Sequence, residues 1–241
     1  MSLASPEVAS VIHAVLLCYE NPDQTLLRWE RDVLPALERA SEAFGLAGAV
    51  TVVDNSAGMS DALNARFRAD YVRPGTNLQY GPGINLAVRR RPSAFTVYAC
   101  TRHGRAFDSS WMTDLLAPLV ADPRAGLAGC LWGSNSPEGV ADATGQAWVA
   151  DQFRFVDEGG RGYVPQHVQG GVFAARTEVL LRFPYDAAIP HLYTDHLITW
   201  RALKAGYRCA DVPGVRSVWR DRWREKYSMD GVKYLHDDEH T

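Results

Sequence analysis

The first half of the chain alternates short apolar runs with stretches in which apolar residues recur every three or four positions. Five short runs have the length and composition of strands, and they cover residues 11–18, 49–53, 70–72, 95–99 and 125–131. Runs of this kind that alternate with helical patterns are typical of a parallel sheet buried on both faces. The pattern therefore predicts an α/β fold with a mostly parallel sheet and helices on both of its faces.

The intervening helices carry start and stop signals. Asn21 and Pro22 supply an N-cap and a first helical residue, and apolar positions then recur at helical spacing until Gly45. Pro35 is predicted to bend this helix, because proline removes one backbone hydrogen bond. Two further helical patterns cover residues 84–90 and 109–120.

The second half of the chain differs in composition and pattern. Residues 132–167 are rich in Gly, Ser, Asn and Asp, which predicts a long excursion or a small antiparallel patch. The segment "VQGGVFAARTEVLLRF" predicts a strand, a turn and a helix. The segment "YTDHLITWRALKAGYRCADVP" predicts a helix that ends at Gly206, followed by a strand and a proline stop.

Composition limits the class of protein. With 241 residues, of which 46% are hydrophobic, the chain can bury a sizeable core, and we expect a single domain over residues 1–241. The formal net charge of −3 gives no general attraction to nucleic acid, so nucleic acid is not an expected partner. The apolar run 11–18 is too short to cross a membrane and lacks the basic flank of a signal peptide. We therefore expect a cytoplasmic protein without a transmembrane segment.

Polar residues follow the second strand, where a parallel sheet binds its ligands. The segment "VTVVDNS" places Asp54, Asn55 and Ser56 at the end of a buried strand. A carboxylate at this point is suited to bind a base or a ribose, and an ordinary Asx turn is the alternative.

A glycine-containing loop follows the third strand. In "NLQYGPGINLAV", Gly81 and Gly83 lie between Asn77 and Asn85. The glycines let the backbone approach a ligand, and the asparagines are suited either to bind sugar hydroxyls or to brace the loop. The segment does not fit the G-x-G-x-x-G fingerprint of dinucleotide-binding proteins, because position 86 is Leu.

Together these segments resemble the GT-A nucleotide-sugar glycosyltransferases of the family 2 type, a group of inverting enzymes. The matching pieces occur in the family's order over about residues 11–218, and they are "VIHAVLLCYENP", "VTVVDNS", "NLQYGPGINLAV", "FDSSWMTDLLAPLVADPRAGLAG", "VQGGVFAARTEVL" and "TDHLITWRALKAGYRCADVP". The resemblance implies a Rossmann-like GT-A fold with a nucleotide-sugar-binding half over residues 10–131. It also implies an acceptor-side half with a small antiparallel region over residues 132–218, and a tail over residues 219–241.

The resemblance also implies roles for individual residues. Asp195, in "TDHLITWR", stands where the family places its general base, which takes the proton from the acceptor hydroxyl. A helix N-terminal acid is the structural alternative for Asp195. Gly170, Gly171 and His196 fall on the acceptor side. The residues implied for donor binding are Asp54, Asn55, Ser56, Asn77, Gly81 and Asn85.

The end of the fourth strand departs from the family pattern. The Asp-x-Asp element that binds a divalent metal across the diphosphate is replaced by "CTRHGR", with Arg102, His103 and Arg105. We interpret these residues as cations that bind the donor diphosphate in place of a metal, which makes a metal-independent enzyme the simplest hypothesis. The alternatives are a solvated basic loop, or Mg²⁺ or Mn²⁺ held by His103 and an acid such as Asp108.

The sequence thus predicts a glycosyltransferase that moves a sugar from a UDP- or dTDP-sugar to a hydroxyl of a glycan, lipid-linked or small-molecule acceptor, in polysaccharide or glycoconjugate biosynthesis. A catalytically inactive sugar-nucleotide-binding module would share every match. A nicotinamide-dependent enzyme should show the glycine fingerprint after its first strand, where "LLCYENPD" lacks it. The tail 219–241 mixes Trp, Tyr, Arg and Lys, which fits an acceptor lip, a peripheral contact with a membrane, or a docked helix.

Overall fold

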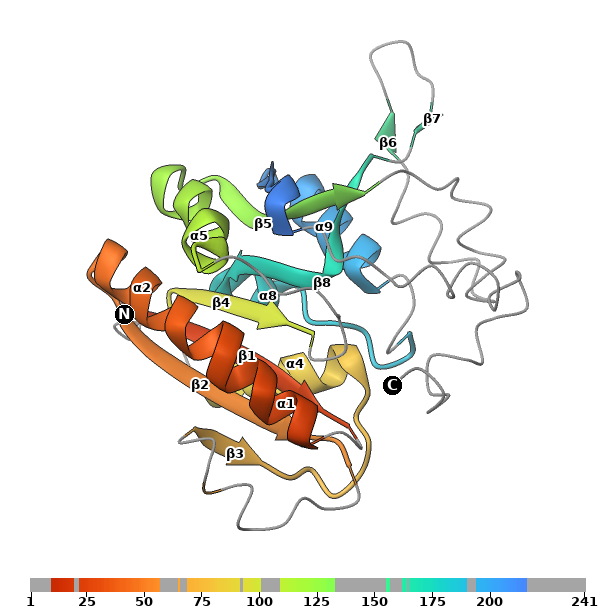
Figure 1. Cartoon of the computed structure of the whole chain (residues 1–241). Helices are drawn as coiled ribbons and strands as arrows, with labels where there is room; N and C mark the ends of the chain where they lie inside the picture. Colours follow the sequence, from red (N-terminus) through yellow and green to blue (C-terminus); the bar gives the residue numbers. More distant parts are fainter. Residues whose placement is uncertain are drawn as a thin grey trace, which may run out of the picture.

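The structure is a computed structural model, and it describes residues 10–19, 22–56, 65, 69–91, 93–100, 109–132, 155–156, 162–163, 165–189 and 194–215. These residues build a layered α/β arrangement around one large sheet (Figure 1). The basic segment with Arg102, His103 and Arg105 lies outside the described residues, as do Asp108 and the tail 219–241.

The large sheet has seven strands in the order β3-β2-β1-β4-β8-β5-β9. Its strands are β1 (Val11–Cys18), β2 (Ala47–Asp54), β3 (Asp70–Val72), β4 (Phe95–Ala99), β5 (Ala125–Trp132), β8 (His167–Arg176) and β9 (Arg208–Asp211). Neighbouring strands are parallel except at β8, which runs antiparallel to both β4 and β5. The predicted mostly parallel sheet is confirmed, and each strand predicted in the first half is present.

A second, two-stranded sheet lies within the excursion that follows β5. It pairs β6 (Phe155–Val156) with β7 (Gly162–Tyr163) in antiparallel fashion. This pairing matches the small antiparallel patch predicted for residues 132–167.

Helices cover both faces of the large sheet, as predicted. The helical elements are α1 (Pro22–Arg28), the π-helical turn η1 (Trp29–Val33), α2 (Leu34–Phe44), α4 (Tyr80–Arg90), α5 (Trp111–Ala121), α8 (Thr177–Arg182), α9 (Thr194–Lys204) and the 3₁₀ turn η2 (Pro213–Val215). Alternate strand residues face opposite cores: Leu16 of β1 packs with α1, α2 and α5, whereas its neighbour Val15 packs with α4, α8 and α9. Figure 1 shows α1 and α2 in front of the sheet and α4 behind it.

The long first helix departs from regular geometry just before Pro35. It ends as predicted at Gly45, whose φ of 64° is left-handed, and the turn η1 precedes the proline. Since Pro35 has no N–H, the turn before it loses an α-helical hydrogen bond, and π turns are one way in which helices absorb such a loss.

Helix α4 begins earlier than the pattern predicts. The expected start was residue 84, but the helix starts at Tyr80, directly after Gln79. The glycines and the proline at positions 81–83 suggested a loop. Pro82 is tolerated because the first turn of a helix has no internal partners for its N–H groups. Gly83 lets this turn approach β1, since a Cβ there would lie 3.0 Å from a Leu17 methyl.

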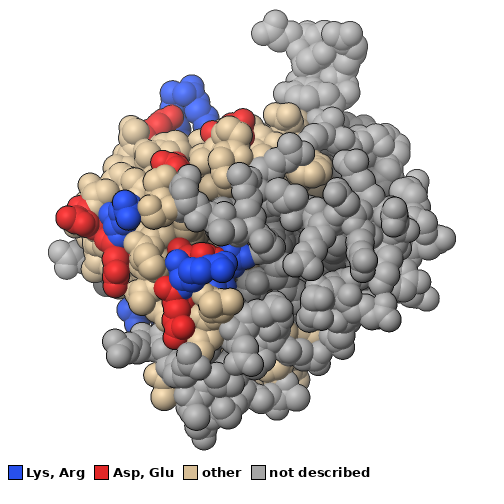
Figure 2. Space-filling view, viewed as in Figure 1, with Lys and Arg blue, Asp and Glu red and all other residues tan. Residues whose placement is uncertain are grey.

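Charges of both signs are mixed on the described surface, where Figure 2 shows Lys and Arg side chains beside Asp and Glu. Within the described parts of the chain, the helices fall short of the length and apolar character required to span a bilayer.

Candidate functional site

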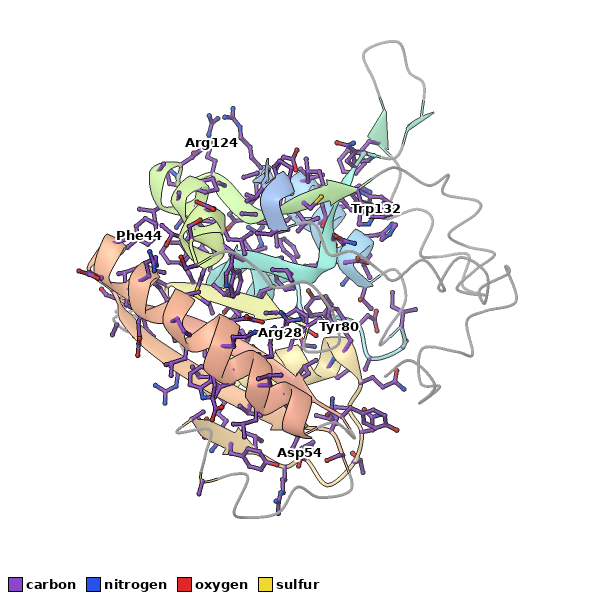
Figure 3. The ribbon with its side chains drawn as sticks, viewed as in Figure 1. Arg28, Phe44, Asp54, Tyr80, Arg124 and Trp132 are labelled. Carbon is purple, nitrogen blue, oxygen red and sulfur yellow. The ribbon has the colours of Figure 1, made fainter. Side chains whose placement is uncertain are left out.

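The carboxyl ends of β1, β2 and β4 share one edge of the sheet with the first residues of β8. Because β8 runs antiparallel to β4, Ala99 pairs with Val172, and the Cys100 N–H donates a 2.8 Å hydrogen bond to the Gly171 carbonyl. Figure 3 labels Asp54, which ends β2, and Tyr80, which begins α4; both lie toward this edge. Several polar residues predicted from separate segments therefore meet at one edge.

Asp54 is buried at this edge, and its side chain is 0% exposed. Its Oδ1 accepts hydrogen bonds from the Ser56 N–H at 3.0 Å and from the Ser56 hydroxyl, and its Oδ2 accepts one from the Tyr71 hydroxyl. The Arg73 Nε lies 3.7 Å from Oδ2. Burial and the bond to Asp54 raise the pKa of Tyr71, so its hydroxyl keeps its proton. Asp54 thus organises the loop at the strand end, and its predicted contact with a nucleotide stays a prediction.

Asn55 braces the glycine-containing loop. Its Oδ1 accepts a bond from the Leu78 N–H and its Nδ2 donates to the Gln79 carbonyl, each at 3.2 Å. The Asn77 Oδ1 accepts the Gln79 N–H at 2.7 Å. Gln79 has a φ of 64°, which is uncommon for a residue with a side chain, and these bonds hold it there.

Asn85 connects α4 to the segment that follows α8. Its Nδ2 donates to the Tyr185 carbonyl at 2.8 Å, and its Oδ1 accepts the Tyr185 N–H at 3.0 Å. Gly81 is buried in the first turn of the same helix. Of the two uses foreseen for the asparagines, bracing is the one seen, and their contact with a donor stays a prediction.

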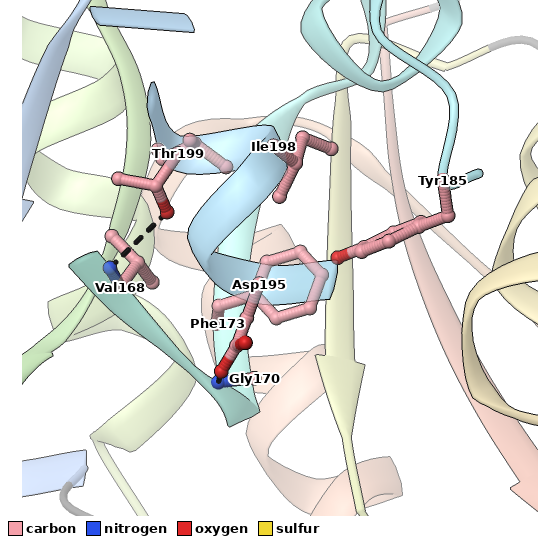
Figure 4. A pocket seen from close by; sticks show the side chains of 8 residues that line it. Val168, Gly170, Phe173, Tyr185, Asp195, Ile198 and Thr199 are labelled. Carbon is pink, nitrogen blue, oxygen red and sulfur yellow. Dashed lines mark hydrogen bonds between the residues drawn. The ribbon is translucent and has the colours of Figure 1, made fainter. Parts of the chain in front are cut away.

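Asp195 lies in the first turn of α9 beside Gly170, and its side chain is 24% exposed. Its Oδ2 accepts the Gly170 N–H and its Oδ1 accepts the His196 N–H, both at 3.0 Å. Figure 4 shows the carboxylate turned toward Gly170 at the side of a small pocket. That pocket is otherwise lined mainly by apolar side chains, among them those of Phe173 and Ile198. Asp195 is therefore an oriented carboxylate that stays partly exposed to solvent.

Two buried imidazoles flank this carboxylate. His167 Nε2 lies 3.9 Å from the Asp195 Oδ2, and His196 Nε2 lies 3.9 Å from the Oδ1. The two rings are stacked with centroids 3.4 Å apart, and both meet the Trp200 ring edge-on. Burial lowers the pKa of His196 to about 4; Asp195 opposes this shift and His167 adds to it. His196 is therefore neutral at physiological pH.

These three side chains form a candidate metal-binding group. Suitable ligand atoms of His167, Asp195 and His196 lie within 4.8 Å of one another. Ligand atoms about 2.1 Å from a tetrahedral ion stand about 3.4 Å apart, so small side-chain shifts would bring the group to that geometry. Two imidazoles and one carboxylate suit Mn²⁺ or Zn²⁺ better than Mg²⁺, which prefers oxygen ligands.

Sequence reasoning missed several residues at this edge. The short run 70–72 predicts only a strand, yet Tyr71 and the neighbouring Arg73 both reach Asp54. Tyr80 donates a hydrogen bond to the Gly170 carbonyl at 2.8 Å. No sequence spacing relates these residues, because each contact joins segments that only the fold brings together.

The sequence matches no protein-family model and no curated protein. Among solved structures, the chain is similar to the mannosyltransferase PcManGT from Pyrobaculum calidifontis in complex with GDP-Man and Mn²⁺. The two share 16% sequence identity with a TM-score of 0.57, and the match covers 92% of this chain and 64% of the mannosyltransferase. It is also similar to glucosyl-3-phosphoglycerate synthase from Mycobacterium tuberculosis in complex with Mn²⁺, UDP-Glc and phosphoglyceric acid, with 16% identity, a TM-score of 0.55, and coverage of 89% and 75%.

These similarities establish the fold and no more. The mixed α/β sheet matches that of GT-A, Rossmann-like glycosyltransferases, as the sequence predicts. The chain spans about two thirds of the mannosyltransferase's length, 64%.

Proposed function

We propose that the protein is a glycosyltransferase that moves a sugar from a nucleoside diphosphate donor to an acceptor hydroxyl. The observation that carries this proposal is the position of Asp195. It is a partly exposed carboxylate oriented by two backbone N–H groups, at the sheet edge that Asp54 also occupies, in a fold shared with nucleotide-sugar enzymes.

Asp195 is suited to act as the general base. Each carboxylate oxygen accepts one backbone N–H, which fixes the plane of the group, while its exposed part can meet an acceptor hydroxyl. In the proposed reaction, Asp195 takes the hydroxyl proton as the acceptor oxygen attacks the anomeric carbon from the face opposite the leaving nucleotide. The nucleoside diphosphate leaves, and the anomeric centre is inverted.

The donor is assigned to the edge around Asp54. Two structural neighbours were solved with GDP-Man and with UDP-Glc, which supports a nucleotide-sugar donor for the shared fold. For this chain we propose a UDP- or dTDP-sugar, bound near Asp54, Asn55 and Asn77, and a glycan, lipid-linked or small-molecule acceptor.

The charge on the leaving diphosphate needs a positive partner. Cys100 is bonded to Gly171, the residue after Gly170, and the basic residues Arg102, His103 and Arg105 follow Cys100 closely in the sequence. We propose that these cations bind the diphosphate. A metal is the alternative, held by the group of His167, Asp195 and His196 or by His103; the neighbours bound to Mn²⁺ keep this alternative open.

The test is a transfer assay with purified protein and a panel of UDP-, dTDP- and GDP-sugars, read as released nucleoside diphosphate with and without candidate acceptors. We expect release from at least one donor, and thermal shifts should identify the donors that bind. Binding without turnover over the whole panel would instead indicate an inactive sugar-nucleotide-binding module.

The same assay in excess EDTA separates the cationic mechanism from a metal. We expect activity to persist in EDTA and to fall in Arg102→Ala and Arg105→Ala. Loss in EDTA and recovery with Mn²⁺ would refute metal independence, and His167→Ala and His103→Ala would then show which metal site is used.

A further inference from the structure

We propose that Tyr80 is a positioning residue for Asp195 and acts on its carboxylate through the backbone of Gly170. This inference rests on the proposed function, in which Asp195 is the general base. Tyr80 lies on α4 and Asp195 on α9, and the bonding glycine between them belongs to β8. Three separate elements therefore meet at Gly170.

Gly170 uses both of its backbone polar groups in this link. Its carbonyl accepts the Tyr80 hydroxyl at 2.8 Å, and its N–H donates to the Asp195 Oδ2 at 3.0 Å. Glycine has the largest backbone freedom of any residue, so its two peptide groups are oriented by such bonds rather than by a side chain. Removing the Tyr80 hydroxyl would loosen the carbonyl, and with it the direction of the N–H that holds Asp195.

Packing around Gly170 leaves no space for a side chain. A Cβ at this position would lie 2.9 Å from the Tyr80 hydroxyl oxygen, 3.1 Å from the Asp195 Cβ and 3.1 Å from the Asp195 Oδ2. The glycine thus permits Tyr80 and Asp195 to approach the same backbone atoms from two sides. A displacement of either residue would act on Gly170, because both are bonded to its backbone.

The Tyr80 hydroxyl is itself held in a defined place. Its ring packs edge-on against Tyr98, with centroids 5.2 Å apart, and against Tyr185, with centroids 5.4 Å apart. Burial, together with Tyr185 and Tyr98, raises the pKa of Tyr80 well above its usual value. The hydroxyl therefore keeps its proton and remains a hydrogen-bond donor at any working pH.

The link continues to the donor side of the site. Tyr80 directly follows Gln79, whose carbonyl accepts a hydrogen bond from Asn55, the residue after Asp54. Asn55, Gln79, Tyr80 and Gly170 thus connect the strand end assigned to the donor with the carboxylate assigned to the acceptor. The positioning of the base is coupled to the order of the donor-side loop.

The first test measures turnover and donor affinity of Tyr80→Phe, with Tyr207→Phe as the matched control. The Tyr207 hydroxyl donates to Glu178 and lies away from the site, so its removal controls for the loss of a tyrosine hydroxyl. We expect kcat to fall about tenfold in Tyr80→Phe while donor KM stays within about twofold, because one orienting hydrogen bond is lost. A kcat equal to that of Tyr207→Phe would overturn the proposal.

A double-mutant cycle separates positioning of Asp195 from a general structural effect. If Tyr80 acts through Asp195, then Tyr80→Phe should not lower the residual rate of Asp195→Asn any further. An additional, fully additive loss in the double variant would show that Tyr80 acts by another route.

A measurement that needs no activity tests the link directly. We expect hydrogen exchange of the Gly170 amide, followed by NMR, to be about fivefold faster or more in Tyr80→Phe than in Tyr207→Phe. Equal exchange rates would overturn the link even in an active enzyme. Absence of sugar transfer in the wild type would refute the proposed function, whereas accelerated exchange would still establish the connection between Tyr80 and Gly170.

Discussion

Replacing Asp195 with Asn removes the charge of the proposed base and keeps its size. General-base catalysis typically contributes about 100- to 10,000-fold to a rate, which is about 3 to 5 kcal/mol of barrier at 1.36 kcal/mol per tenfold. We therefore expect kcat of Asp195→Asn to fall roughly 100-fold or more. Donor affinity should change little, because Asp54 and its loop are untouched.

The substitution also has a structural cost that the contacts define. Both carboxylate oxygens accept a backbone N–H, from Gly170 and from His196. The Asn amide has only one oxygen, so its NH₂ group must face one of these donors and one hydrogen bond is lost. That loss, together with a weaker interaction with the start of α9, costs about 1 to 2 kcal/mol because the side chain is partly exposed to water. For a chain of this size we expect the melting temperature to fall by roughly 2 to 8 °C.

The assay pairs steady-state kinetics with calorimetric donor binding and thermal unfolding. Asp186→Asn is the matched control, since Asp186 also accepts a backbone N–H, that of Ala188 at 2.9 Å, and lies outside the pocket. If Asp195→Asn keeps near-normal turnover and shows only the loss in stability, then Asp195 is a helix-terminal structural acid and the proposed mechanism is wrong.

Three further predictions concern other parts of the molecule. Asp54→Ala should weaken donor binding by about 1 to 3 kcal/mol in calorimetry, and unchanged affinity with an intact fold would remove Asp54 from the site. Gly129→Ala should lower the free energy of unfolding by about 1 to 3 kcal/mol in urea titration, because a Cβ there would lie 2.7 Å from a Val168 methyl. Gly214→Ala is the control, since a Cβ at Gly214 would have nothing within 4 Å. Equal stability of the two variants would contradict the close packing at Gly129. Burial lowers the pKa of His13 from 6.5 to about 4, so the unfolded state binds more protons between these values. Acidification through this window should therefore cost wild type up to about 3 kcal/mol more than His13→Gln, and parallel pH–stability curves would disprove this.

Much of the fold was readable from local sequence. The strands β1 and β4 were predicted with the bounds that the structure has, because a strand buried on both faces needs a nearly continuous apolar run and leaves a clear signal. The bounds of the partly buried edge strand β3 were predicted as well. Helix ends were predictable where a glycine takes a left-handed backbone conformation. Gly45 and Gly206 both have positive φ and end their helices as predicted. His13 lies in the apolar run of β1, and it is a packed core residue that is buried and bonded to Thr51.

Strand order and strand direction required the tertiary structure. The alternation of strands and helices predicted a mostly parallel sheet but did not place β8 between β4 and β5. Which strands pair depends on how elements distant in sequence pack together, and no local pattern encodes that choice. The start of α4 was missed for a related reason, since packing of Gly83 against Leu17 favours a helix where local propensity suggests a loop.

The candidate site divides in the same way. Asp54 was identified from a local feature, a carboxylate that follows a buried strand, whereas Asp195 was identified because its segment resembles the family 2 glycosyltransferases. Their partners were not foreseen: Tyr71 reaches Asp54 from the next strand, and Tyr80 reaches Gly170 across 90 positions of sequence. The sequence by itself identified the candidate residues, and their roles in the chemistry stay predictions. Only the folded chain decided which backbone atoms orient them, because hydrogen bonds form between groups that packing brings within about 3 Å, however far apart they lie along the chain.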